Sequence, residues 1–326
     1  MKNVANKWLF LVILIIIMQI SANFSDYKLT FDDPQYLTES ILQIIDTDLD
    51  NDQQDEITLA GANYIARELF IYWLSADEQM HPEVKWKSPN LYEDHSIIWA
   101  ASGKFISVQN QLLVFSSTRY YLFQFGNNNV NLLKENKQSL DPLCLSAGDI
   151  DGDGQTEIIL AREGKITSKI INGIIQVWKF NEGNLELVAE SDLLGNIRGV
   201  GVGDIDQDGC SEIFIDEGYK FGSGNIHMFR FLERKLNEKL VVKKAANGPI
   251  YAMQVKKFSE GVRLVTSTAK GNINFFAWEN NTLVKKDPEL NFNKNLMSMA
   301  TPDLNHDQIP ELVVACYPQE FMILKK

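Results

Sequence analysis

The sequence predicts an all-β protein that folds as a six-bladed β-propeller of four-stranded antiparallel blades. Three observations predict this fold. An acidic stretch occurs four times, a pair of strands rich in aromatic residues recurs along the chain, and the C-terminal unit lacks one strand that the N-terminal segment can supply. Units of roughly 50 residues, each reading as four short strands, are typical of propeller blades.

Each acidic stretch reads D-x-[DN]-x-D-x-x-x-E and continues directly into apolar β-formers. The four stretches are "DLDNDQQDEITLA" from Asp48, "DIDGDGQTEIILA" from Asp149, "DIDQDGCSEIFI" from Asp204 and "DLNHDQIPELVVA" from Asp303. The two long gaps between their starts are each about twice the short one. The stretches therefore belong to units 1, 3, 4 and 6, and units 2 and 5 carry none.

The strands of a unit can be assigned in order. The first is small and apolar, as in "LSAGD" (145–149), which suits the crowded innermost position of a blade. The second follows the glutamate of the acidic stretch, and an aromatic hairpin such as "QVWKFNEGNLELV" (176–188) forms the outer two. The same hairpin occurs in a unit without an acidic stretch, as "RYYLFQFGNNNVNLL" (119–133).

The last unit is incomplete, because "ELVVACYPQEFMILKK" (311–326) leaves it one strand short. The segment "DYKLTF" (26–31) matches the missing outer strand. We therefore expect the N-terminal strand to complete the C-terminal blade, which closes the ring and leaves no open sheet edge.

The N-terminal segment has the pattern of a secretory signal. Two lysines precede the apolar run 8–20, which is short for a membrane span, and the small residue Ala22 follows it. We interpret residues 1–22 as a cleaved signal peptide, with an uncleaved anchor as the alternative, and residues 23–326 as one domain. This predicts an exported protein that is secreted, periplasmic or at the cell surface.

Composition narrows the classes of partner. The 326 residues are 45% hydrophobic and carry a formal net charge of −12, which disfavours nucleic acid and anionic membranes and favours cations. Three widely spaced cysteines do not form a disulfide scaffold. We expect a monomer that binds an exported protein or a glycan.

The acidic stretches suit a calcium ion. Oxygen atoms on alternate positions of a tight loop can converge on one centre, and Ca²⁺ takes six to eight such ligands. An EF-hand needs a glutamate at position 12, but that position is apolar in all four stretches, for example Leu59 and Leu160. Gly154 is expected to allow the left-handed turn that wraps one loop around its ion.

The four stretches and the β-strands around them resemble the FG-GAP (VCBS) repeat, the calcium-binding blade of integrin alpha-chain propellers. The resemblance implies up to four Ca²⁺ ions, each held in a hairpin loop by positions 1, 3, 5, 7 and 9. The implied ligands are Asp48, Asp50, Asp52, Gln54 and Glu56; Asp149, Asp151, Asp153, Gln155 and Glu157; Asp204, Asp206, Asp208, Cys210 and Glu212; and Asp303, Asn305, Asp307, Ile309 and Glu311.

This sequence departs from the family pattern at three points. Position 9 is Glu where the family usually has Asp, Gln53 and Gln308 replace the turn glycine, and Asn305 removes one charge. We therefore expect the Asp303 loop to bind most weakly.

The sequence favours binding over catalysis. Its four histidines are dispersed, and no motif of a hydrolase, zinc protease or phosphate loop occurs. We expect a non-catalytic interaction or adhesion module, with a secreted polysaccharide lyase or hydrolase as the alternative. By analogy with integrin propellers, the ligand face lies opposite the calcium loops, with ordinary solvated loops as the alternative there. The candidate residues on that face are Arg162, Lys165, Lys169, Tyr219 and Phe221.

Overall fold

The computed structural model describes residues 28–33, 40–63, 65–77, 80–92, 98–116, 118–126, 129–138, 140–167, 170–217, 224–317 and 320–325. The predicted signal peptide lies outside these residues. Within them, no helix is long and apolar enough to cross a membrane.

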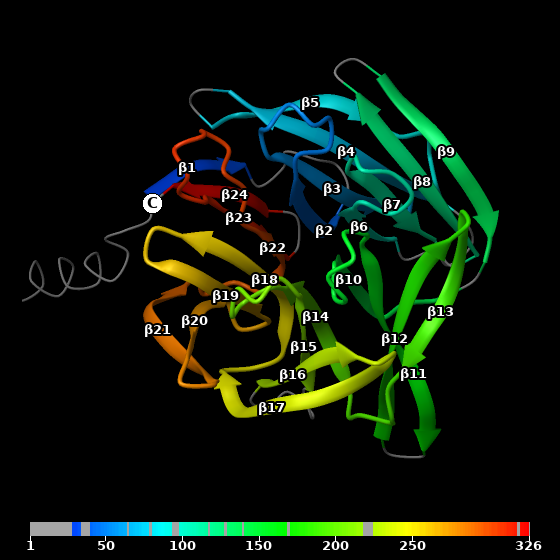
Figure 1. The fold of residues 1–326 in the computed structure, drawn as a ribbon. Helices are drawn as coiled ribbons and strands as arrows, with labels where there is room; N and C mark the ends of the chain where they lie inside the picture. Colours follow the sequence, from blue (N-terminus) through cyan, green and yellow to red (C-terminus); the bar gives the residue numbers. More distant parts are fainter. Residues whose placement is uncertain are drawn as a thin grey trace, which may run out of the picture.

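The described strands form six antiparallel sheets of four strands each, arranged in a ring (Figure 1). This confirms the predicted six-bladed β-propeller. Blades 1 to 3 consist of β2 (Ser40–Thr47), β3 (Glu56–Asn63), β4 (Glu68–Ala76) and β5 (Pro82–Lys87); β6 (Trp99–Gly103), β7 (Gln111–Phe115), β8 (Arg119–Gly126) and β9 (Asn129–Lys137); and β10 (Cys144–Gly148), β11 (Glu157–Thr167), β12 (Ile170–Asn181) and β13 (Asn184–Glu190).

Blades 4 to 6 follow the same plan. They consist of β14 (Ile197–Gly203), β15 (Glu212–Glu217), β16 (Gly224–Leu232) and β17 (Lys235–Ala246); β18 (Ile250–Phe258), β19 (Gly261–Thr268), β20 (Asn272–Glu279) and β21 (Thr282–Asn291); and β22 (Leu296–Ala300), β23 (Leu312–Cys316), β24 (Glu320–Lys325) and β1 (Lys28–Asp33).

The ring closes as predicted, because β1 is the outer strand of blade 6. It pairs antiparallel with β24, with Lys28 opposite Lys325 and Asp33 opposite Phe321. In Figure 1 the blue β1 lies beside the red β24. The strand extends to Asp33 rather than ending at Phe31, and its register with β24 shifts between Leu29 and Phe31.

The first strand of each blade lies at the centre of the ring, where β2, β6, β10, β14, β18 and β22 contact one another in chain order and β22 contacts β2. Backbones approach closely here. A Cβ atom on Gly201 of β14 would lie 2.6 Å from the Cβ atom of Met253 in β18. The small residues of these strands are therefore required by packing, and the strands surround a central cavity of about 250 Å³.

The hydrophobic core lies between neighbouring blades. Aromatic residues of β4 and β8 meet between blades 1 and 2, where the rings of Trp73 and Phe125 pack edge-to-face at 5.2 Å. Tyr120 of β8 packs in the same way on Phe180 of β12 between blades 2 and 3. Burying one such ring contributes roughly 1.5–3 kcal/mol, so these contacts fix each blade against the next.

Candidate metal centres

The four acidic stretches form the connections between the first and second strands of blades 1, 3, 4 and 6, as predicted. They lie at one end of the ring, because consecutive loops contact one another. Asn110 of the blade 2 loop donates to the Asp48 carbonyl at 2.7 Å, and the Thr156 N–H of the blade 3 loop donates to the Lys104 carbonyl at 3.0 Å. The Ser211 N–H of blade 4 likewise donates to the Asp149 carbonyl at 2.9 Å.

The first aspartate of each acidic loop holds the turn together. Both carboxylate oxygens of Asp48 accept backbone N–H groups, from Asp52 at 2.9 Å and Gln53 at 3.0 Å. The carboxylates of Asp149, Asp204 and Asp303 bind the N–H of position 6 in the same way. The backbone N–H groups of all four position-7 residues bind the aspartate at position 5 at 2.9–3.0 Å; these residues are Gln54, Gln155, Cys210 and Ile309.

The turn is left-handed at position 6, as the glycines there suggested. Gly154 has φ 86° and Gly209 has φ 93°, and Gln53 and Gln308 adopt the same conformation with φ 73° and 64°. A side chain in this region costs on the order of 1–2 kcal/mol. The hydrogen bonds of the first aspartate therefore hold two glutamines in a strained conformation that glycine adopts freely.

The closing glutamate has a structural role that explains its length. In all four loops its Oε2 atom accepts the backbone N–H of position 2, from Leu49 to Glu56 at 2.9 Å and from Leu304 to Glu311 at 2.8 Å. The corresponding distances for Glu157 and Glu212 are 3.0 and 3.1 Å. All four glutamates are at most 5% exposed. This contact gives the glutamate side chain the same structural role in all four loops.

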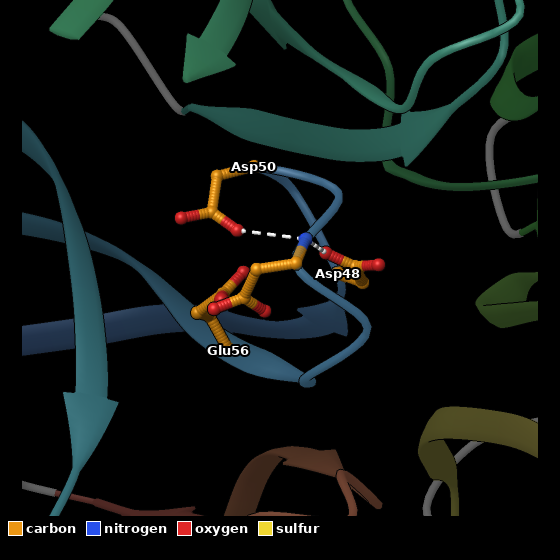
Figure 2. A group of neighbouring side chains, drawn as sticks. Asp48, Asp50 and Glu56 are labelled. Carbon is orange, nitrogen blue, oxygen red and sulfur yellow. Dashed lines mark hydrogen bonds between the residues drawn. The ribbon is translucent and has the colours of Figure 1, made fainter. Parts of the chain in front are cut away.

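Three of the loops bring carboxylates together. One ligand atom from each of Asp48, Asp50, Asp52 and Glu56 lies within 4.8 Å of the others, and Figure 2 shows Asp48, Asp50 and Glu56 converging inside the turn. The same holds for two shorter sets, Asp149 with Asp151 and Glu157, and Asp204 with Asp206 and Glu212. Asp153 and Asp208 do not join these sets, and the Asp303 loop forms no such set among the described residues.

Burial shifts the titration of the closing glutamates. Desolvation raises the pKa of Glu56 to about 8, with a further rise from the charges of Asp50 and Asp52, although the Leu49 hydrogen bond lowers it. Burial likewise raises the pKa of Glu157, Glu212 and Glu311, each to about 7. The pKa of the closing glutamate is therefore raised furthest in the Asp48 loop.

These residues fit a hard divalent cation. Their donors are carboxylate and amide oxygens, as Ca²⁺ prefers. Among the described residues, the buried oxygens Asp206 Oδ1 and Asp303 Oδ1 have no hydrogen-bond partner. Burial and the neighbouring Asp52 and Asp48 raise the pKa of Asp50, so a cation there would relieve their repulsion.

The structure adds basic residues that the sequence analysis missed. In each blade that has an acidic loop, one residue of the third strand lies opposite the closing glutamate. It is Lys179 in blade 3, Arg230 in blade 4 and Lys325 in blade 6. The strand register gives this position: in blade 3, for example, Ile158 pairs with Trp178, so the preceding Glu157 lies opposite the following Lys179. In blade 1 the same register places Ser75 there, because Ile57 pairs with Leu74.

Two of these basic groups enter their loops. Lys179 Nζ lies 3.1 Å from Asp151 Oδ2, 2.7 Å from Asp153 Oδ2 and 2.5 Å from Glu157 Oε1.

Arg230 pairs with Asp206, lies 3.1 Å from Asp208 Oδ2 and lies 2.8 Å from Glu212 Oε1. Lys325 reaches only Asp307, at 3.5 Å.

The predicted ligand face is largely outside the described structure. Lys169, Tyr219 and Phe221 lie outside the described residues, as does the side chain of Lys165. Arg162 is half-buried in β11. Most of residues 161–173 are paired strand rather than an exposed loop, because β11 continues to Thr167 and β12 begins at Ile170.

Comparisons with known proteins agree with this architecture. Residues 149–215, which include the blade 3 and blade 4 loops, match the FG-GAP-like repeat family. No curated protein matches the chain. A crystal structure of BBS1N in complex with ARL6DN, soaked with mercury, superposes with a TM-score of 0.55 and 12% identity over 92% of this chain and 96% of that one. At this identity the likeness concerns the fold alone. The chain is thus a six-bladed β-propeller with a central segment similar to FG-GAP-like repeats.

Proposed function

We propose that this protein is an exported, calcium-binding β-propeller that serves as a non-catalytic interaction module for a protein or a glycan. The observation that carries the proposal is the recurrence of one acidic loop geometry at the same place in four blades. Three of these loops gather carboxylates within 4.8 Å, which costs electrostatic repulsion unless a cation is present.

Calcium is the ion that the donor set supports best. The gathered oxygens come from carboxylates on a short, irregular loop, and the described residues around them offer no histidine or thiolate cluster of the kind zinc prefers. Extracellular calcium modules work with weak sites because calcium is abundant outside the cell. The signal-like segment at 1–22 supports that location.

The role we propose for calcium is stabilisation of the ring. In blades 1 and 3 the residue before the closing glutamate links its loop to another blade. Asp55 Oδ2 accepts the Asp303 N–H of blade 6 at 3.1 Å and pairs with Lys256 of blade 5 at 2.8 Å. Thr156 Oγ1 accepts the Lys104 N–H of blade 2 at 2.9 Å. An ion that fixes a loop therefore also fixes a contact between blades.

A binding role is favoured over catalysis by how the described carboxylates are used. General acid–base catalysis on a polysaccharide needs two carboxyl groups that converge on a substrate. The carboxylates gathered here stabilise turns, accept buried backbone N–H groups and pair with Lys179 or Arg230.

The test is thermal unfolding of the mature protein in calcium and in excess chelator. We expect chelator to lower the melting temperature and added calcium to restore it, because an ion bound only by the folded state stabilises that state by mass action. Identical curves in both solutions contradict the proposal. A glycan array and a pull-down with the calcium-loaded protein then identify the class of ligand.

A further inference from the structure

The four acidic loops differ in the residue that faces them from the third strand. Blades 3, 4 and 6 place a basic residue opposite the closing glutamate, and blade 1 places Ser75 there. The backbone of the loops is otherwise alike, with the same bond from position 2 to the glutamate. The loops therefore differ in the group that neutralises the negative charge of their carboxylates.

In blade 3 the ammonium group of Lys179 lies where a bound cation would be expected. It contacts Asp151, Asp153 and Glu157 at 2.5–3.1 Å, so it meets the three acidic positions after the first aspartate. The lysine side chain is only 18% exposed.

In blade 4 the guanidinium of Arg230 does the same with Asp206, Asp208 and Glu212. A fixed guanidinium cannot be deprotonated in a protein and matches carboxylate geometry well. A divalent ion entering this loop would have to displace Arg230 or share its ligands.

In blade 1 the position opposite the glutamate holds Ser75 instead of a basic residue, and a cavity lies beside it. This cavity of about 530 Å³ lies beside the loop, lined by Asp50, Asp52, Glu56 and Ser75. Oxygen atoms of water or of a ligand can therefore complete the coordination of an ion held by the loop.

Two further residues line this cavity, Trp73 and Lys85. Trp73 is 6% exposed, and its indole Nε1 has no hydrogen-bond partner among the described residues. Lys85 also lines the cavity, but its ammonium pairs with Glu83 at 3.2 Å.

We propose that Lys179 and Arg230 take the place of the ion in blades 3 and 4, so that the Asp48 loop of blade 1 is the tight divalent cation site. This inference rests on the proposed function and assigns its ion to one loop. The Asp303 loop, with Asn305 in place of an aspartate and Lys325 at 3.5 Å from Asp307, binds more weakly.

The test is calorimetric titration of the metal-free mature protein with calcium chloride, with bound ions counted by native mass spectrometry. We expect one tight site in the wild type, which Asp50→Asn removes and the matched Asp151→Asn leaves in place. Lys179→Ser is expected to gain a second tight site, and Arg230→Ser likewise. Ser75→Lys is expected to weaken calcium binding at the wild-type site at least tenfold. This variant tests the proposal independently if Lys179→Ser does not fold.

The outcomes separate the two proposals. Three or more equivalent tight sites in the wild type overturn the present inference and leave the proposed function intact. A folded Lys179→Ser protein with an unchanged site count, or a Ser75→Lys protein with unchanged affinity, also overturns the inference. Absence of calcium binding in the wild type and in every variant overturns the proposed function itself.

Discussion

The Asp48 loop of blade 1 and the Asp149 loop of blade 3 have the same backbone and different surroundings. Both open with an aspartate that binds the N–H of position 6, and both close with a buried glutamate that binds the N–H of position 2. Yet Lys179 contacts three carboxylates of one loop, whereas Ser75 borders a cavity beside the other.

The comparison distinguishes how the turn of an acidic loop is held together from how the charge of its carboxylates is balanced. The turn itself is built in both blades from hydrogen bonds between carboxylates and backbone N–H groups. The negative charge must still be balanced, and one residue on a neighbouring strand decides whether the protein or the solution supplies the positive charge. The predictions below test that division.

The largest effect is expected from removing the internal cation. Lys179→Ala leaves the buried Glu157 without its ion pair, and breaking a buried pair costs about 3–5 kcal/mol. We expect the lower end, because Lys179 is partly exposed. Denaturant unfolding in excess chelator measures the loss. Ser75→Ala in blade 1 is the control and should change the free energy of unfolding by less than about 0.5 kcal/mol. Equal losses in the two variants would contradict the comparison.

The next effect is the dependence of stability on calcium. With free calcium at about 100 times the dissociation constant, one site stabilises the folded state by about 2.7 kcal/mol. We expect wild type and Asp151→Asn to gain this much, and Asp50→Asn to gain little. Thermal unfolding across a calcium series measures the gain. A gain that is lost with Asp151→Asn and retained with Asp50→Asn would assign the site to blade 3 and reverse the comparison.

The acidic loops and the closure of the ring could be predicted from the sequence. The basic residue that faces the loop in blade 3 but not in blade 1 could not. The acidic stretches could be predicted because their chemistry is local, and β1 could be placed because the last unit visibly lacked a strand. The partnership of Lys179 with Glu157 depends on the register between β11 and β12. Hairpins of different length separate the equivalent pairs in the other blades, so no fixed spacing identified them. The glutamates of position 9 also became interpretable only when their contacts with the N–H of position 2 were seen.

A smaller effect is expected from pH. The pKa of Glu56 is raised to about 8 by burial, above its value of 4.5 outside the fold. The metal-free folded state therefore binds this proton more tightly than the unfolded state, and the stability it contributes is present at low pH and lost as pH rises through about 8. We expect the metal-free melting temperature to fall by a few degrees between pH 6 and pH 9, and by less in saturating calcium.

Glu56→Gln isolates the blade 1 part of this pH dependence. Glutamine can still accept the Leu49 N–H, as Gln111 accepts the Ile106 N–H at 2.9 Å in blade 2. We expect the variant to lose the decline between about pH 7 and pH 8, where Glu56 alone among the closing glutamates still contributes, and to keep the contribution of the other three, which ends near pH 7. An unchanged profile would show that Glu56 does not titrate in this range.

The smallest effect concerns the turns, where blades 1 and 3 should respond in opposite directions to exchange at position 6. Gln53 has φ 73°, and Gly154 has φ 86° with open space, free of other atoms within 4 Å, where a Cβ atom would lie. Gly154→Ala should therefore cost about 1 kcal/mol from backbone strain alone. Gln53→Gly relieves the same strain but gives the unfolded chain more freedom, so its gain should stay below about 1 kcal/mol. Denaturant unfolding of both variants in saturating calcium measures the pair. Two losses of equal size would mean that the side chain of Gln53 makes contacts that offset its strain, and that the two turns differ in more than their glycine.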